Sequence, residues 1–225
     1  MSLNSGLTTA EIKTLLAGEI EAADGTMSDC FDDGARLFAR SILPWVSEVR
    51  PQDRVQGGVA LRATEGEVWV HPYVFRLICR NGQIMAQTLQ STQIVFSDTF
   101  SNEHASELIR QAVRACAEKD AFSAQAEKMR LMPRSPVDYM LTMLPLLAML
   151  SPDFRTRLLL DIGQRFESGN DRSLYGVLNA VTSLARDTQE PDLRWRLEEL
   201  GGAVLNGQPL KSRGPRRAVR ELVGV

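Results

Sequence analysis

The sequence predicts an α+β protein: a small mixed or antiparallel sheet of about four strands, covered by helices and followed by a helical subdomain. Three observations support this class. Apolar residues recur at strand spacing between Val55 and Phe96. They recur at helical spacing from Asn102 onward. Two prolines in four residues, Pro133 and Pro136, then separate that helix from a second helical region.

Length and composition are those of an ordinary globular protein. The chain has 225 residues, of which 44% are hydrophobic and 24% charged, so it can bury a sizeable core without a disulfide or a metal. Its formal net charge is -2. That charge predicts no overall attraction to nucleic acid or to an anionic membrane, so any such binding must be local.

Cysteine usage and hydropathy predict a cytoplasmic protein with no membrane partner. The three cysteines, Cys30, Cys79 and Cys116, are far apart among apolar neighbours, which predicts buried free thiols in a reducing compartment. The polar N-terminus does not resemble a signal peptide. The most apolar run, residues 140–150, contains Pro145 and is about half the length that spans a bilayer, so we expect a buried helix.

Residues 1–50 are predicted to form N-terminal helices. Thr8 or Thr9 can cap the first one. A second is expected over residues 28–43, where apolar side chains recur at helical spacing before Pro44. Its first turn would contain three acidic residues: Asp29, Asp32 and Asp33. The helix dipole stabilises carboxylates there, and a metal site is the alternative.

Residues 51–132 are predicted to form the α+β core. Alternating residues on both sides of Glu65-Gly66 indicate a hairpin, and residues 84–88 and 93–96 indicate further strands. Residues 73–80 fit either a strand or a helix, and the following Asn81-Gly82 does not decide between them. The covering helix begins at Asn102 and can extend to Met129.

Residues 136–205 are predicted to form the helical subdomain. The segment 137–150 is apolar on nearly all sides, so we expect it to be the central helix. Further helices begin at Pro152 and near Asp171 or Ser173, and another runs from Pro191 and ends at Gly201-Gly202. Residues 206–225 are predicted to form a basic C-terminal tail.

One of these helices carries a row of polar side chains. Tyr175, Asn179, Thr182 and Arg186 align at i, i+4, i+7 and i+11. If buried, they must be hydrogen-bonded. They can line a polar pocket, to which Asn81 is added as a further candidate, or they can form an internal polar network or a half-exposed flank. The neighbouring Gly176 predicts a close backbone contact.

Two runs resemble a known family. The run VHPYVFRLICRNG ends at Gly82, and SLYGVLNAVT ends at Thr182. Together they resemble the phage- and plasmid-borne proteins catalogued as domain of unknown function 932, whose members show FRLVCxNG and, later, GxxNAVT. The resemblance covers about residues 55–200, and this chain departs from it in its N-terminal part and basic end. It implies a mobile-element origin and cytoplasmic residence, and no reaction or cofactor.

The sequence predicts no catalytic set, cofactor or metal. The two histidines, His71 and His104, are not spaced as ligands of one metal ion. His71 and Cys79 can meet across a sheet as a thiol–imidazole pair, although a thiol in an apolar run is typical of a core position.

Two basic features predict nucleic-acid binding. Arg76 and Arg80 project together whether their segment is strand or helix, so they can clamp phosphates or a carboxylate, or instead form ion pairs with acidic groups of the helical part. The stretch 207–220 carries five basic residues and no acidic one. These are Lys211, Arg213, Arg216, Arg217 and Arg220. A solvated terminus without a ligand is the alternative for this stretch.

The leading hypothesis is therefore a non-enzymatic, nucleic-acid-associated protein of phage or plasmid type, with single-strand binding or an accessory role in annealing among its activities. The alternative is a protein-interaction module that modulates a host factor through the helical part, with Trp195 as the residue to watch. A small-molecule enzyme is the third possibility. It requires a deep pocket lined by Tyr175, Asn179, His71 and Cys79.

Overall fold

The computed structural model describes residues 7–77, 81–96 and 101–209. In these ranges the chain forms seven helices and one open antiparallel sheet of seven strands, which confirms the α+β class and shows that the expected four strands are too few. The strands are β1 (Thr26–Asp32), β2 (Leu37–Ile42), β3 (Val46–Arg50), β4 (Asp53–Thr64), β5 (Glu67–Arg76), β6 (Asn81–Ile84) and β7 (Thr92–Val95). The helices are α1 (Thr9–Ala22), α2 (Asn102–Ala117), α3 (Lys119–Leu131), α4 (Tyr139–Leu146), α5 (Pro152–Ser168), α6 (Leu174–Asp187) and α7 (Pro191–Asn206).

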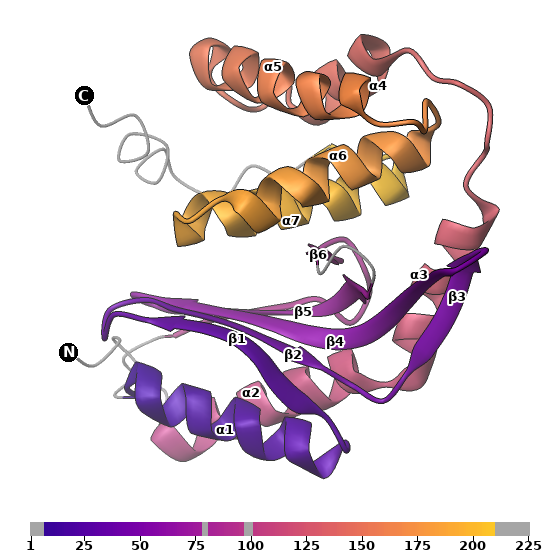
Figure 1. The fold of residues 1–225 in the computed structure, drawn as a ribbon. Helices are drawn as coiled ribbons and strands as arrows, with labels where there is room; N and C mark the ends of the chain where they lie inside the picture. The colour runs from indigo at the N-terminus through magenta and orange to yellow at the C-terminus, as the bar shows by residue number, and fades with distance from the viewer. Residues whose placement is uncertain (1–6, 78–80, 97–100, 210–225) are drawn as a thin grey trace.

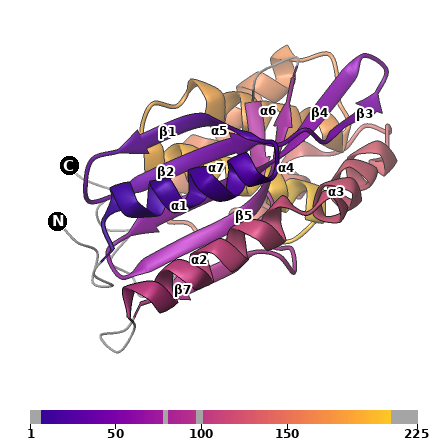
Figure 2. The same ribbon diagram turned by 90° about the horizontal axis from the view of Figure 1, so that it is seen from below.

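Helices cover both faces of the sheet (Figure 1). The strand order is β1-β2-β4-β5-β6, with β3 paired to β4 and β7 paired to β5. Figure 2 shows α1, α2 and α3 across the lower face, while α6 and α7 lie above the opposite face and α4 and α5 lie beyond them (Figure 1). Alternate side chains of β4 point to opposite faces of the sheet. Val59 and Leu61 pack on the lower helices, and Ala60 packs near Trp195 of α7.

The first helix begins as predicted. The Thr8 hydroxyl accepts a hydrogen bond from the Glu11 backbone N–H at 3.2 Å, and the Glu11 carboxylate accepts one from the Thr8 backbone N–H at 2.7 Å. This capping box satisfies two backbone donors that the first turn leaves free. Ile12, Leu16 and Ile20 are buried on the face of α1 that meets the sheet.

The predicted helix over residues 28–43 is wrong, because β1 and β2 form an antiparallel hairpin there. The turn contains Gly34 at φ 82° and Asp33, whose carboxylate accepts bonds from the Ala35 and Arg36 backbone N–H groups. Asp-Gly is a strong hairpin signal. Helices cover both faces of β2, so nearly all its residues are buried. Its sequence therefore lacks the alternation of polar and apolar residues that would have predicted a strand.

The β4–β5 hairpin is confirmed. Thr64 pairs with Glu67 across the turn, where Gly66 adopts φ 80°. β5 continues as far as Arg76, which resolves the first part of the ambiguous segment as strand; residues 78–80 lie outside the described residues. β6 ends at Ile84, where the sequence predicted a strand to begin, and β7 lies within one residue of its predicted position.

The covering helix is present but divided. Ser101 caps α2, and its buried Ile109 and Val113 pack on the sheet. At Glu118 the backbone becomes extended, with ψ 136°, and α3 begins one residue later. The predicted single helix is therefore two helices, α2 and α3, which meet at Glu118.

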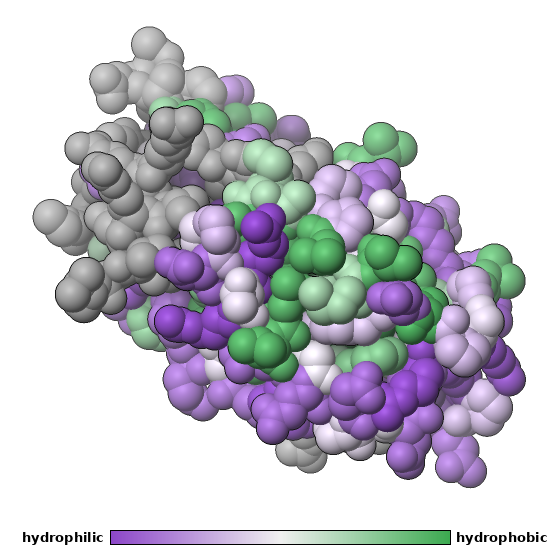
Figure 3. Space-filling model, turned by 90° about the horizontal axis from the view of Figure 1, so that it is seen from above, coloured by the Kyte–Doolittle hydropathy of each residue, from purple (hydrophilic) through white to green (hydrophobic). Residues whose placement is uncertain are grey.

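Residues 137–150 do not form the predicted central helix. α4 covers only part of this segment, and within it only Met143 and Leu146 are buried. α6, whose residues are mostly buried, takes the central position. The outer side of α4 is left exposed, and Figure 3 shows apolar side chains gathered on the side of the molecule that lies uppermost in Figure 1.

The predicted end of the last helix at Gly201-Gly202 is also wrong. α7 continues to Asn206, and Gly207 ends it in the left-handed conformation at φ 63°. A Cβ atom at Gly202 would lie 2.1 Å from the Ile84 carbonyl oxygen of β6. Glycine is therefore required here by the close approach of α7 to the sheet.

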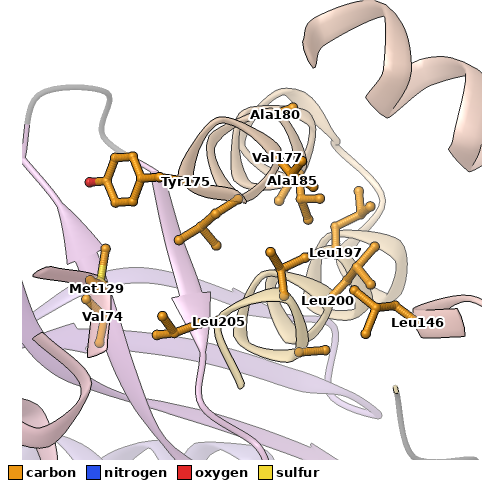
Figure 4. Close-up of a cluster of buried hydrophobic side chains, with 14 of the residues drawn as sticks. Val74, Met129, Leu146, Tyr175, Val177, Ala180, Ala185, Leu197, Leu200 and Leu205 are labelled. Atoms are coloured by element: carbon orange, nitrogen blue, oxygen red, sulfur yellow. The ribbon is translucent and has the colours of Figure 1, made fainter. Parts of the chain in front are cut away.

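One buried cluster joins the helical part to the rest of the chain. Figure 4 shows Leu200 and Leu205 of α7 facing the same interior as Val74 of β5 and Met129 of α3. The predicted boundary at residues 132–136 lies in the connection between α3 and α4. That connection therefore separates two stretches of sequence that share one core.

The cysteines differ from one another. Cys30 is exposed, which contradicts the predicted burial, because β1 is the edge strand of the sheet. Cys116 is buried as predicted; its thiol donates to the Gln90 carbonyl at 3.1 Å, and burial raises its pKa. Cys79 lies outside the described residues. Within the ranges described, no helix has the length and apolarity that crossing a bilayer requires.

Candidate functional site

A polar cluster lies where the sheet meets α6. Arg76, at the end of β5, donates to both carboxylate oxygens of Asp53, at the start of β4, at 2.7 and 2.6 Å. The Tyr175 hydroxyl on α6 donates to the same carboxylate at 2.6 Å. Burial of the phenol, followed by its bond to the carboxylate, raises the pKa of Tyr175. Asp53 thus accepts three short bonds inside the molecule.

The ring of Tyr175 contacts two cations. The guanidinium of Arg50 lies 3.9 Å from the ring centroid, and that of Arg76 lies 5.5 Å from it. Arg50 also pairs with Asp171 at 2.7 Å, just before α6 begins. These contacts attach the first turn of α6 to the strands.

The predicted pocket residues lie together. Asn179 accepts a bond from Arg76 at 2.9 Å, and Asn81 of β6 donates to the Thr182 hydroxyl at 2.9 Å. Arg76, Asn81, Asn179 and Thr182 line one small cavity of about 10 Å³, which is about the room that one water molecule needs. Asn81 Oδ1 is buried, and no described residue donates a bond to it. A water is the occupant that this geometry fits, because a substrate would be too large.

The remaining member of the predicted polar row points elsewhere. Arg186 pairs with Asp187 near the end of α6 at 2.8 Å. The predicted close contact at Gly176 is present, since a Cβ atom there would lie 1.9 Å from the Asp171 carbonyl oxygen.

The structure describes one of the two arginines proposed to bind phosphate. Arg76 is bonded to Asp53 and Asn179, so it does form an ion pair, but with a carboxylate of β4 and not with an acidic group of the helical part. Arg80 lies outside the described residues, as do all five basic residues of the tail: Lys211, Arg213, Arg216, Arg217 and Arg220. The nucleic-acid interface therefore stays a prediction.

A second charged cluster lies between α7 and the sheet. Glu198 of α7 pairs with Arg40 of β2 at 2.7 Å, and the two side chains are 2% and 3% exposed. Asp29 of β1 pairs with Arg40 and with Arg194, and Arg194 returns to Glu198 at 3.4 Å. Four alternating charges thus form a closed ring, in which the two buried members, Arg40 and Glu198, compensate each other.

Trp195 occupies the centre of this interface. It is 0% exposed, so the residue to watch for a partner contact is instead a core residue that α7 buries against the sheet. Its ring lies 5.9 Å from those of Phe38 and His71. His71 is 1% exposed and lies between Trp195 and Trp69, and the cysteine proposed to pair with it lies outside the described residues.

The acidic trio does not form a helix N-terminus. Asp29 and Asp32 lie on β1, and Asp33 lies in the turn that follows, where it pairs with Arg36 at 2.9 Å. Across the described ranges, no group of three or more His, Cys, Asp or Glu side chains is placed to hold a metal ion. The helical interpretation fails because this segment pairs with β2 as a strand.

An apolar surface completes the candidate sites. We name it the α4–α5 face, formed by Met140, Leu141, Leu144, Met149 and Leu160, which are 46%, 74%, 40%, 62% and 68% exposed. Figure 3 shows this side of the molecule. An apolar patch of this kind on a folded chain is typical of an interaction surface.

Sequence reasoning missed Asp53 and the α4–α5 face. Nothing in the pattern joins Asp53 to Tyr175, because 122 positions separate them. The α4–α5 face did have a signal, a segment that is apolar on nearly all sides, but that pattern predicts burial and does not show which side stays exposed.

The fold and these sites define an open antiparallel α+β protein with two internal polar clusters and one exposed apolar face. Neither a family model, nor a curated protein, nor a solved structure matches the chain. The resemblance described above therefore stays a prediction.

Proposed function

We propose that this chain is a nucleic-acid-associated protein of phage or plasmid type, which binds through the basic stretch 207–220. The observation that carries the proposal is charge segregation. This stretch contributes +5 with no acidic residue, so the rest of the chain carries -7, the difference between the net charge of -2 and +5. Phosphates are attracted to the basic stretch and repelled by the acidic remainder of the chain.

The contacts of Arg76 limit the proposal to that stretch. A guanidinium that already satisfies a buried carboxylate is not available to bind phosphate without breaking that pair. Single-strand binding and assistance in annealing are the activities that fit a cationic stretch without base-reading geometry, because contacts to the backbone are independent of sequence.

The test is binding of labelled single- and double-stranded oligonucleotides at about 50 mM salt, with log affinity followed against log salt. Five phosphate contacts predict a slope of about -3.5 on single strands. Replacing the five basic residues with glutamine keeps the length and should abolish binding. As a matched control, Arg134→Gln removes an exposed charge outside the stretch and should change affinity less than about twofold. The absence of binding by the full chain at low salt would refute the proposal.

The second candidate is a protein-interaction module, and the α4–α5 face favours it. This face takes the place of Trp195, since Leu141 is 74% exposed whereas Trp195 is fully buried. Such a module needs a partner with matching apolar surface, and a host factor is one class of partner.

A further inference from the structure

The folded monomer does not explain why the apolar side chains on the outer side of α4 are exposed. α4 is apolar on nearly every side, yet it buries only Met143 and Leu146. Met140, Leu141 and Leu144 are exposed, as are Met149 in the following loop and Leu160 on α5. Covering exposed apolar side chains of this size with a second surface lowers the free energy.

The size of the α4–α5 face suits a protein partner. Five such side chains present on the order of 500 Å², near the upper end for a single patch on a monomer. A standard interface buries about 800 Å² on each partner. An apolar centre of this area with a polar rim around it therefore reaches the size of a stable contact.

The charges beside the face are self-complementary. Asp153, Arg157 and Asp161 are exposed on α5 at i, i+4 and i+8, so their signs alternate along one side. If an antiparallel copy of α5 is placed about a two-fold axis near Leu159, Arg157 of each chain lies beside Asp161 of the other. An isologous contact requires this kind of self-match.

We propose that the α4–α5 face binds a second copy of this chain in an isologous two-fold contact. This deepens the second candidate function and does not rest on nucleic-acid binding. Neither nucleic acid nor a membrane fits the face, because its centre is uncharged and its α5 side alternates Asp153, Arg157 and Asp161, so the rim is not basic. Anionic surfaces attract basic rims instead.

The first test is the mass of the full chain in solution without nucleic acid, by sedimentation equilibrium from 1 to about 100 µM at physiological salt. A dimer is expected, and Leu141→Asp should raise its dissociation constant at least about 30-fold because a charge replaces an apolar contact within the face. The thermal midpoint of the monomer should stay unchanged, since the side chain is 74% exposed. The matched control is Leu89→Asp, at a fully exposed leucine outside the face, which should leave dimerisation unchanged.

The second test separates a two-fold contact from any other. Arg157→Asp should weaken the dimer about tenfold, and adding Asp161→Arg should restore it, because the exchanged charges pair again across the axis. A wild-type monomer at 100 µM, a dimer that tolerates Leu141→Asp, or a failure of the double variant to recover would each overturn the proposal. Because no nucleic acid is present, these outcomes are independent of the basic stretch.

Discussion

Glu198 and Glu199 are neighbours on α7, yet their side chains meet different environments. Glu198 is compensated by Arg40, which pairs with it inside the interface. Glu199 accepts a hydrogen bond from the Trp195 indole at 2.9 Å. Burial raises the pKa of Glu199 to about 7, although Arg196, Trp195 and Arg62 act in the opposite direction.

This difference makes stability depend on pH. The folded-state pKa of Glu199 exceeds the ordinary value of 4.5, so its contribution is fully present below pH 4.5 and is lost as pH rises to about 7. Glu199→Gln keeps an acceptor for the indole and removes the titration. We expect the free energy of urea unfolding to fall less steeply between pH 5 and 7 in this variant than in the wild type.

The control is Glu167→Gln, at an exposed carboxylate on α5, which should leave the pH profile unchanged. Equal slopes in the wild type and Glu199→Gln would show that Glu199 does not titrate in this range.

The polar row of α6 shows how far the residue scale can be read from sequence. Helical spacing placed Tyr175, Asn179 and Thr182 on one side, and the structure brings these three to the sheet. Their partners Asp53 and Asn81 come from strands distant in sequence, and no local pattern encodes that pairing.

At the scale of elements, glycines decide how closely α7 approaches the sheet. Gly202 faces the Ile84 carbonyl at a distance that excludes a Cβ atom. The sequence rule that a glycine pair ends a helix fails here because packing against β6 offsets the low helix propensity of glycine.

Gly202→Ala should therefore destabilise the protein by about 2 kcal/mol, because the added methyl forces α7 away from β6. The matched control is Gly18→Ala in α1, where a Cβ atom would contact nothing within 4 Å; it should stabilise by about 0.5–1 kcal/mol through helix propensity. Thermal and urea unfolding of both variants measure this. Equal effects would show that backbone propensity, and not close packing, governs both sites.

At the scale of the whole molecule, the sheet and helical parts share one core. Val74 and Met129 belong to the same buried cluster as Leu200 and Leu205 of α7. Charged contacts such as Arg40 with Glu198 join the same two parts. Neither part can keep its core when the other unfolds.

We therefore expect a single cooperative unfolding transition. Far-ultraviolet circular dichroism and tryptophan fluorescence should give coincident midpoints, because Trp195 is buried between α7 and the sheet. Different midpoints for the two signals would indicate that the sheet and the helical part unfold separately.

The sequence by itself determined the α+β class, the β4–β5 hairpin, the start of α2 and the alignment of the α6 polar row, because each depends on residues close in the chain. Tertiary structure decided the rest. The segment expected to form the second helix became β1 and β2, because β2 pairs with β1 and with β4. Contact with β6 allowed α7 to continue past its two glycines. Because α6 occupies the central position, one side of α4 stays at the surface. Long-range contacts outweigh local preferences of about 1 kcal/mol per residue, and only the folded chain contains them.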